Sequence, residues 1–94
     1  MTLFLADFVH TDNGFTCSDS GFRALSNAQE CSGAVSYAKT FNSKARIDST
    51  YMYVSDRPKG CYIWGSGTMY FNSHPTGGRS TSVASICWKG NKLF

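Results

Sequence analysis

Four widely spaced cysteines constrain the fold of this 94-residue chain more than any other feature: Cys17, Cys31, Cys61 and Cys87. They are separated by 14, 30 and 26 positions, whereas zinc sites usually contain close pairs such as C-x2-C. An even number of well-spread cysteines in a short chain is typical of two disulfides, with free buried thiols as the less favoured alternative. We therefore expect two disulfides in an oxidising compartment, with no metal and no cofactor.

The four cysteines allow three disulfide pairings, and the sequence does not choose strictly among them. We prefer Cys31–Cys61, which would fix a helix to a strand, together with Cys17–Cys87, which would join the two ends of the domain. The second choice is Cys17–Cys31 with Cys61–Cys87. Either pair of cross-links would matter for stability, because so short a chain buries only a small core.

Length and composition predict a single domain over residues 1–94. Hydrophobic residues make up 41% of the chain and charged residues 16%, which excludes a disordered chain of low hydrophobicity and high charge. No apolar run is long enough to span a bilayer. Within the domain we expect a compact core over about residues 14–90 and an N-terminal strand over residues 2–10.

The first half of the chain is expected to contain one helix. Ser26 and Gln29 have the spacing of a capping box, with Ser26 as the N-cap. The apolar positions that follow, from Ala28 to Phe41, recur at helical spacing, so the helix should bury one stripe. A short strand is predicted before it, over residues 15–17.

The second half of the chain is expected to be β-structure. Alternation predicts a strand over residues 47–54, and residues 56–60 should end it. Strands over 61–64 and 68–71 flank Gly65-Ser66-Gly67, a link typical of a bulged hairpin. A polar loop over 73–82 and a last strand over 83–89 follow. The economical architecture is an α+β fold, with one helix packed on a small antiparallel sheet.

Neither a catalytic nor a metal site is expected, so we predict that the protein is not an enzyme. Disulfide-bonded cysteines cannot act as nucleophiles, and the acidic residues Asp48 and Asp56 lie in different segments. A histidine before proline in a Gly-rich loop more often holds the loop than performs catalysis. We therefore assign a structural role in the turn and loop to Gly60, Asn72, His74, Pro75 and Gly77.

Aromatic residues are the candidate binding surface. Tyr51 and Tyr53 would share one strand face, and Tyr62 and Trp64 another, which Tyr70 could extend. An exposed row of this kind could stack on sugar rings or on bases. Core packing is the favoured alternative, because large aromatic side chains also fill the core of a small domain. Nucleic acid is not an expected partner, since the nine Lys and Arg form no concentrated stripe.

Three segments resemble a known group of proteins: Pro58-Lys59-Gly60-Cys61-Tyr62, Tyr70-Phe71-Asn72-Ser73-His74-Pro75-Thr76-Gly77 and Ile86-Cys87. In these segments the chain is similar to small, largely uncharacterised cysteine-containing proteins of algae and related protists. The similarity covers roughly residues 14–90, with Trp88 as a departure before Lys89. The resemblance implies a secreted or lumenal address and brings no activity with it.

Together these observations predict a non-catalytic accessory subunit that docks onto a larger protein assembly. The apolar ends, Leu3-Phe4-Leu5 and Leu93-Phe94, and the basic half of the chain, net +6 over residues 39–94, would make the contacts. The resemblance and the absence of N-glycosylation sequences favour the thylakoid lumen beside a photosynthetic complex. The alternative is a secreted carbohydrate-binding module that uses Tyr51, Tyr53, Tyr62 and Trp64.

Overall fold

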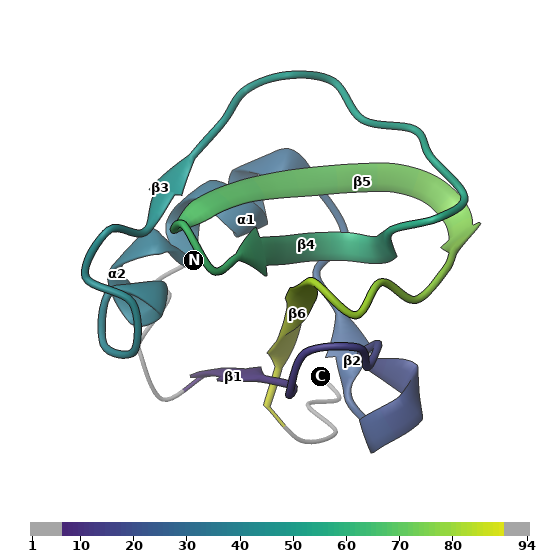
Figure 1. Ribbon diagram of the computed structural model, residues 1–94, viewed down its shortest axis with the longest axis horizontal. Helices are drawn as coiled ribbons and strands as arrows, with labels where there is room; N and C mark the ends of the chain where they lie inside the picture. Colours follow the sequence, from purple (N-terminus) through teal and green to yellow (C-terminus); the bar gives the residue numbers. More distant parts are fainter. Residues whose placement is uncertain (1–6, 90–94) are drawn as a thin grey trace.

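The protein is a small α+β domain built on a curled sheet, and the computed structural model describes residues 7–89 (Figure 1). The strand order is β1-β6-β4-β5-β3, and β2 also pairs with β6. The strands are β1 Phe8–His10, β2 Arg23–Ala24, β3 Arg46–Ile47, β4 Pro58–Trp64, β5 Thr68–Gly77 and β6 Val83–Trp88. The pairing of β3 with β5 is parallel and the other strand pairs are antiparallel, so the prediction of a purely antiparallel sheet was wrong.

Strand β6 connects the β4–β5 hairpin to the short strands β1 and β2, because β6 pairs with β4 along one stretch and with β1 and β2 toward its C-terminal end. Its first four residues, Val83 to Ile86, pair with β4, and its last two residues pair with β2. The short strand β1 pairs with the C-terminal half of β6, from Ile86 to Trp88. In Figure 1, β6 runs away from the β4–β5 hairpin and carries β1 and β2 at the far end. This sharing of one strand curls the sheet.

The β4–β5 hairpin forms around the predicted link of Gly65-Ser66-Gly67, so that prediction is confirmed. Gly67 has a φ of 100° and donates its N–H to Trp64 O at 2.9 Å, which closes the turn. Both strands are longer than expected. β4 already begins at Pro58, because a register shift between Pro58 and Gly60 absorbs the expected strand break, and β5 includes residues 73–77 of the expected polar loop.

Two short helices replace the single predicted helix: α1 (Ala28–Gly33) and α2 (Val35–Ala38). Asn27 is the N-cap instead of Ser26, and its Oδ1 accepts the N–H of Glu30 at 2.8 Å. The predicted stripe is correct at Cys31, Ala34 and Ala38, which are fully buried, whereas Ala28 and Phe41 are exposed. The fully buried side chains of the two helices are therefore small, and the half-buried Tyr37 packs against Phe8 of β1.

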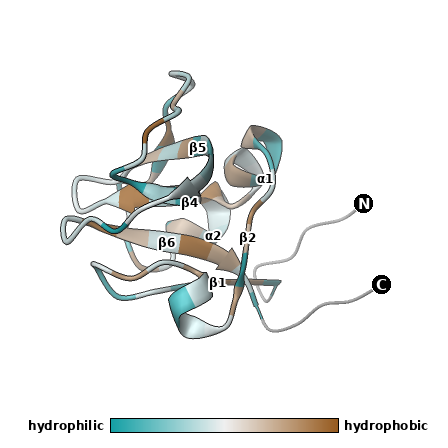
Figure 2. Cartoon of the chain, turned by 90° about the vertical axis from the view of Figure 1, so that its right-hand side faces the viewer, coloured by the Kyte–Doolittle hydropathy of each residue, from teal (hydrophilic) through white to brown (hydrophobic). Residues whose placement is uncertain are grey.

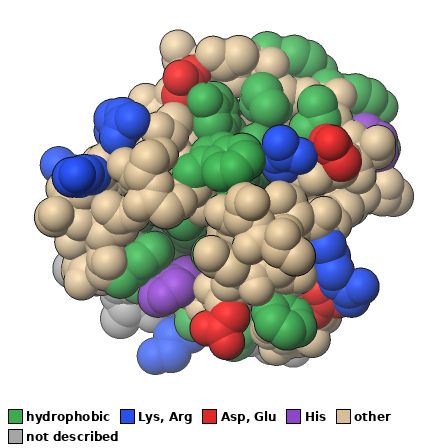
Figure 3. All heavy atoms as spheres, in the orientation of Figure 1, with side chains coloured by type: hydrophobic (Ala, Val, Ile, Leu, Met, Phe, Trp, Pro, Cys, Tyr) green, Lys and Arg blue, Asp and Glu red, His purple; other side chains and the backbone are tan. Residues whose placement is uncertain are grey.

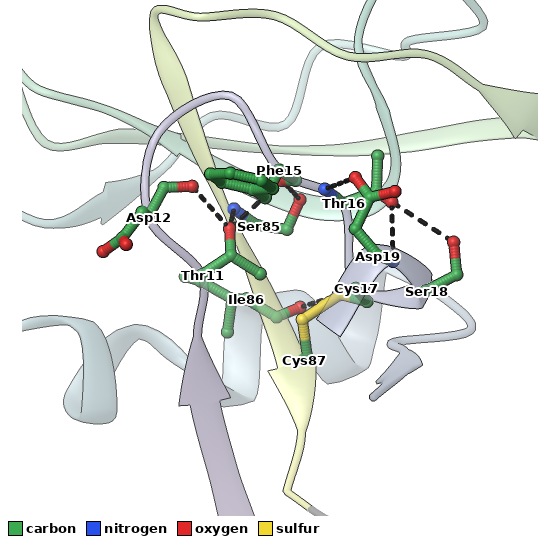
Figure 4. The surroundings of a disulfide bond; sticks show 10 residues. All are labelled: Thr11, Asp12, Phe15, Thr16, Cys17, Ser18, Asp19, Ser85, Ile86 and Cys87. Atoms are coloured by element: carbon green, nitrogen blue, oxygen red, sulfur yellow. Dashed lines mark hydrogen bonds between the residues drawn. A yellow bond between two sulfur atoms is a disulfide. The ribbon is translucent and has the colours of Figure 1, made fainter. Parts of the chain in front are cut away.

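Two disulfides cross-link the domain, and the pairs are Cys31–Cys61 and Cys17–Cys87. The first joins α1 to β4 across the main core. The second joins β6 to a helical turn, η2 (Ser18–Ser20), which follows Cys17 where a strand over 15–17 was expected (Figure 4). Two disulfides fit an oxidising or secreted environment.

Next to the second disulfide, two buried hydroxyl residues, Thr11 and Ser85, hold the segment after β1 against β6 (Figure 4). Ser85 donates its N–H to Thr11 Oγ1 and its hydroxyl to Phe15 O, both at 3.0 Å. Thr11 in turn donates its N–H to Ser85 O at 3.0 Å. These bonds satisfy buried polar groups that would otherwise destabilise the fold.

One main core fills the space between the sheet and the helices, where strands β4 and β6 show brown, hydrophobic segments in Figure 2. It contains Phe8, Leu25, Cys31, Ala34, Ala38, Ala45, Cys61, Ile63, Met69, Ala84, Ile86 and Trp88. Of the predicted N-terminal strand, residues 8–10 are strand and residues 2–6 lie outside the described range. Within residues 7–89, no helix has the length and apolar character that crossing a membrane requires.

The predicted strand over residues 47–54 is wrong for most of its length. Only Ile47 belongs to a strand, β3, and the chain touches the sheet again through an isolated bridge between Met52 and Asn72. Residues 48–57 instead form an irregular segment that arches beyond the edge of β5 in Figure 1. The residue types alternate in the sequence, but the segment forms no continuous ladder with β5 that would order its side chains on two faces.

Candidate functional site

A groove lies between the first turn of α1 and residues 47–51, with β5 beneath it. Its volume is about 610 Å³. The residues from the α1 side are Ser26, Asn27, Ala28, Gln29 and Ser32, and those from the opposite side are Ile47, Asp48, Ser49, Thr50 and Tyr51. Phe71 and Ser73 of β5 complete the lining, and Ile47 and Phe71 are half-buried because they also pack against the core.

The groove exists because the chain leaves β5 and then returns to it. Asp48 donates its N–H to Met69 O at 2.8 Å, and four residues later Met52 O accepts the N–H of Ser73 at 3.0 Å. The residues in between bow away from the strand. Asp48 stabilises the bend, since its Oδ1 accepts the N–H of Thr50 at 2.8 Å, as in an Asx turn.

Tyr51 is the most exposed large side chain of the groove, with 77% of its surface accessible. An aromatic ring held at a bend and open to solvent offers a flat apolar face to a ligand. Tyr53 is also exposed, at 55%, but it does not line the groove and instead packs on His74, with ring centroids 4.9 Å apart. The two tyrosines therefore do not act as one surface, contrary to the expectation that they share a strand face.

The opposite wall is shaped by the helix cap. Asn27 caps α1 through Oδ1, and the Glu30 carboxylate accepts the N–H of Ser26 at 2.7 Å and its hydroxyl at 3.0 Å. Gln29, which was expected to take the role of Glu30, is exposed and lines the groove. With the cap shifted by one residue, the Gln29 amide lines the groove across from the segment that holds Tyr51.

The electrostatics of the groove depend on Asp48. Hydrogen bonds from the Thr50 side chain and N–H, helped by the positive charge of Arg46, lower the pKa of the Asp48 carboxyl. This carboxyl is therefore ionised at neutral pH. Among the described residues that line the groove, Asp48 is the one charged side chain, and the others are apolar, hydroxyl or amide groups.

Asn72 holds the far end of the irregular segment. It is fully buried, and its Nδ2 donates to the carbonyl oxygens of Val54, Arg57 and Pro58 at 2.8 to 3.1 Å. Its Oδ1 accepts the N–H groups of Val54 and His74. A buried amide that satisfies five backbone groups orders a segment that has no strand ladder.

The other predicted loop residues lie nearby, mostly in β5 and not in a loop. His74 Nδ1 accepts the N–H of Gly77 at 2.9 Å and of Thr76 at 3.2 Å. Gly77 pairs with Pro58, while Gly60 has a φ of 88° at the register shift of β4. The structural roles assigned to His74, Gly77 and Gly60 stay predictions, which substitution at each position would test.

The predicted aromatic row on the sheet is not an open platform. Tyr62 is completely buried, and the guanidinium of Arg57 lies over the half-buried Trp64 ring at 5.1 Å. Figure 3 shows hydrophobic side chains gathered over β4 and β5 on this face, with a basic side chain against them. Of the four predicted binding residues, Tyr51 alone lines the groove. The residues that face it across the groove come from α1 and β5, and no sequence pattern had indicated that these segments meet.

A second aromatic cluster lies between β1 and α2. The His10 ring stacks on Phe41 with centroids 3.7 Å apart, and its Nδ1 lies 2.7 Å from the Tyr37 hydroxyl oxygen. Burial lowers the pKa of His10 and raises that of Tyr37. Both groups are therefore neutral at pH 7. His10 and Phe41 also line a shallow cleft of about 360 Å³.

Within residues 7–89, the structure does not assemble a recognisable catalytic or metal-binding group. The four cysteines are all in disulfides, and neither histidine is hydrogen-bonded to a serine. No three His, Cys, Asp or Glu side chains in this range lie close enough to hold a metal ion.

Comparisons with protein-family models, with curated proteins and with solved structures find no match for this chain.

Proposed function

We propose that this protein is a non-catalytic carbohydrate-binding domain of an oxidising compartment. The observation that carries the proposal is the exposed ring of Tyr51 at a groove whose other polar groups are hydroxyls, amides and one carboxylate. Sugar rings present apolar C–H patches on their faces and hydroxyl groups around their edges. The ring of Tyr51 and the apolar floor of Ile47 and Phe71 suit the faces, and the rim groups suit the hydroxyls.

The dimensions of the groove support this proposal. Ligand sites usually enclose roughly 300–1,000 Å³ and combine apolar walls with a few polar groups. The volume of about 610 Å³ lies in that range. Backbone hydrogen bonds to β5 at Asp48 and at Met52 hold the segment that contains Tyr51 in place, and the Asx turn at Asp48 adds to this order. Because the segment is ordered before a ligand binds, the entropy cost of binding is reduced.

The experiment that tests the proposal compares two tyrosines in the same segment. The purified chain is run in native gels that contain neutral or acidic polysaccharides, and its affinity for the retained polysaccharide is measured. Tyr51→Ala should weaken binding about fivefold, since a stacked ring contributes about 1 kcal/mol, and Tyr51→Phe should retain binding. Tyr53→Ala is the matched control and should leave binding unchanged, because Tyr53 packs outside the groove.

Equal losses in the Tyr51→Ala and Tyr53→Ala variants, or no retention by any polysaccharide, would contradict the proposal. Melting temperatures of the variants are measured in parallel. Both side chains are more than half exposed, so we expect their removal to leave the fold intact.

Docking onto a larger assembly remains a prediction from the sequence. The apolar ends that would make the contact, residues 3–5 and 93–94, lie outside the described residues. The excess of positive charge in residues 39–94 is a property of the sequence and identifies no partner. The thylakoid lumen and a photosynthetic partner are likewise expectations from the resemblance alone.

A further inference from the structure

The charge of the groove is opposite to the charge of the chain. The whole chain has a net charge of +3, and a basic protein attracts acidic polysaccharides to its surface without a specific site. The described residues that line the groove include one carboxylate, Asp48, and no Lys, Arg or His. A second carboxylate, Glu30, lies next to the lining, where it accepts hydrogen bonds from Ser26.

Arg46 offsets part of this charge, because its positive charge acts on Asp48, but Arg46 does not line the groove. Arg46 directly precedes the groove residue Ile47, but its guanidinium is committed to the hairpin turn. Its Nη1 donates to Lys44 O and Ser66 O at 3.2 Å, and its Nη2 donates to Thr68 Oγ1 at 2.7 Å. An acidic sugar in the groove would therefore lie beside a carboxylate, with no Lys, Arg or His among the described lining residues to pair with it.

The polar groups that remain suit an uncharged sugar. A carboxylate accepts two sugar hydroxyls without needing a proton, and the Asp48 carboxylate is already oriented by Thr50. The exposed amide of Gln29 and the hydroxyls of Ser32 and Ser49 can both donate and accept. All of these groups can form hydrogen bonds with the hydroxyls of a neutral sugar, without the electrostatic repulsion that a sugar carboxylate would meet at Asp48.

We infer that the groove selects neutral glycans and rejects acidic ones, although the protein as a whole is basic. This inference rests on the proposed carbohydrate-binding function and specifies its ligand class. Acidic polysaccharides would be held only by the basic surface outside the groove, in a manner that salt weakens.

The test uses matched pairs of hexose oligosaccharides, each neutral compound being compared with the same compound oxidised to uronic acids at C6. Affinities are measured by titration calorimetry at 20 mM and 200 mM salt for the unmodified chain, Tyr51→Ala and Asp48→Asn. We expect a neutral oligosaccharide to bind in a Tyr51-dependent way and its oxidised form to bind at least tenfold more weakly. Asp48→Asn should reduce this preference several-fold, because the amide retains the hydrogen-bonding shape and removes the charge.

The outcomes separate the inference from the proposed function. Tyr51-dependent binding of the oxidised compounds, as tight as that of the neutral ones, would overturn the inference and leave carbohydrate binding intact. An absence of Tyr51-dependent binding in both sets would overturn the proposed function and the inference with it. Two results together would support the inference. The neutral compounds should bind in a Tyr51-dependent way, and any binding of the oxidised compounds should weaken with salt and be unchanged in Tyr51→Ala.

Discussion

The side chain of Asn72 binds both backbone polar groups of Val54. Val54 donates its N–H to Asn72 Oδ1 at 3.0 Å, and Asn72 Nδ2 donates to Val54 O at 2.8 Å. One buried amide thus provides the pair of hydrogen bonds that a neighbouring strand would otherwise make. This contact holds the irregular segment, whose other end forms one side of the groove, in the absence of a continuous ladder.

Replacing Asn72 by Ala should lower the free energy of unfolding by about 3–5 kcal/mol, because buried carbonyl and N–H groups of residues 54–58 would lose their partner. Urea denaturation followed by tyrosine and tryptophan fluorescence measures the loss. Ser73→Ala is the control: its hydroxyl also bonds to the segment, at Met52 O, but it is exposed. We expect that control to cost less than about 1 kcal/mol, and an equal cost for both variants would contradict the role assigned to Asn72.

Gly67 should resist substitution, whereas Gly65 in the same turn should not. A Cβ on Gly67 would clash with Lys44 O, and the φ of 100° at Gly67 also disfavours any L side chain. Gly67→Ala should therefore destabilise the fold by about 2–4 kcal/mol, while Gly65→Ala should change stability by less than about 0.5 kcal/mol. Thermal unfolding of the two variants checks this. Similar melting temperatures would show that the turn is looser than the close approach to Lys44 implies.

The two disulfides should stabilise the domain to similar extents. In the chain-entropy model, the separation of 70 residues between Cys17 and Cys87 corresponds to about 4.4 kcal/mol, and the 30 residues between Cys31 and Cys61 to about 3.6 kcal/mol. Paired Cys→Ala variants measure each loss in urea. Since the sum is comparable to the stability of a typical domain, we expect full reduction to unfold the chain.

Peptide mapping without reduction checks the disulfide pairing itself. Digestion should release one cross-linked peptide pair that contains Cys31 and Cys61, and another that contains Cys17 and Cys87. A peptide that links Cys61 to Cys87 would contradict the pairing.

Acid should destabilise the domain through His10. Burial lowers the pKa of His10 below its usual value of 6.5 in the folded chain, and the charge of Asp12 opposes part of this effect. The unfolded chain therefore binds the proton more readily. The stability that neutral His10 contributes is complete above pH 6.5 and is lost as the pH falls from there toward the folded pKa.

Melting temperatures between pH 5 and pH 8 test this prediction in two variants. His10→Gln should flatten the pH dependence, because it removes the titrating group. Asp12→Asn should steepen it, because the opposing charge is gone and the folded pKa falls further. A pH profile that His10→Gln leaves unchanged would exclude His10 as the source.

Local sequence signals correctly predicted the elements that local forces decide. The Gly65-Ser66-Gly67 turn could be predicted because a glycine with positive φ and a hydrogen bond within the turn close it, and Arg46 adds contacts from outside. The apolar residues at helical spacing correctly predicted that Cys31, Ala34 and Ala38 are buried, because side chains three or four positions apart lie on one side of a helix. The capping prediction was wrong by one residue, since Asn27 and Ser26 are both good N-caps and only the position of Glu30 in the folded chain distinguishes them.

Which side chains are buried and which are exposed depends on the tertiary structure. Residues 47–54 alternate like a strand, yet they form no continuous ladder, and the side chain of Asn72 from a later strand takes the backbone hydrogen bonds of Val54. Tyr62 and Tyr51 look equivalent in sequence, but the first is buried and the second is 77% exposed at a groove. Alternation indicates which side chains would share a face if the segment formed a strand. Whether water or another segment meets them depends on long-range contacts that no local pattern contains.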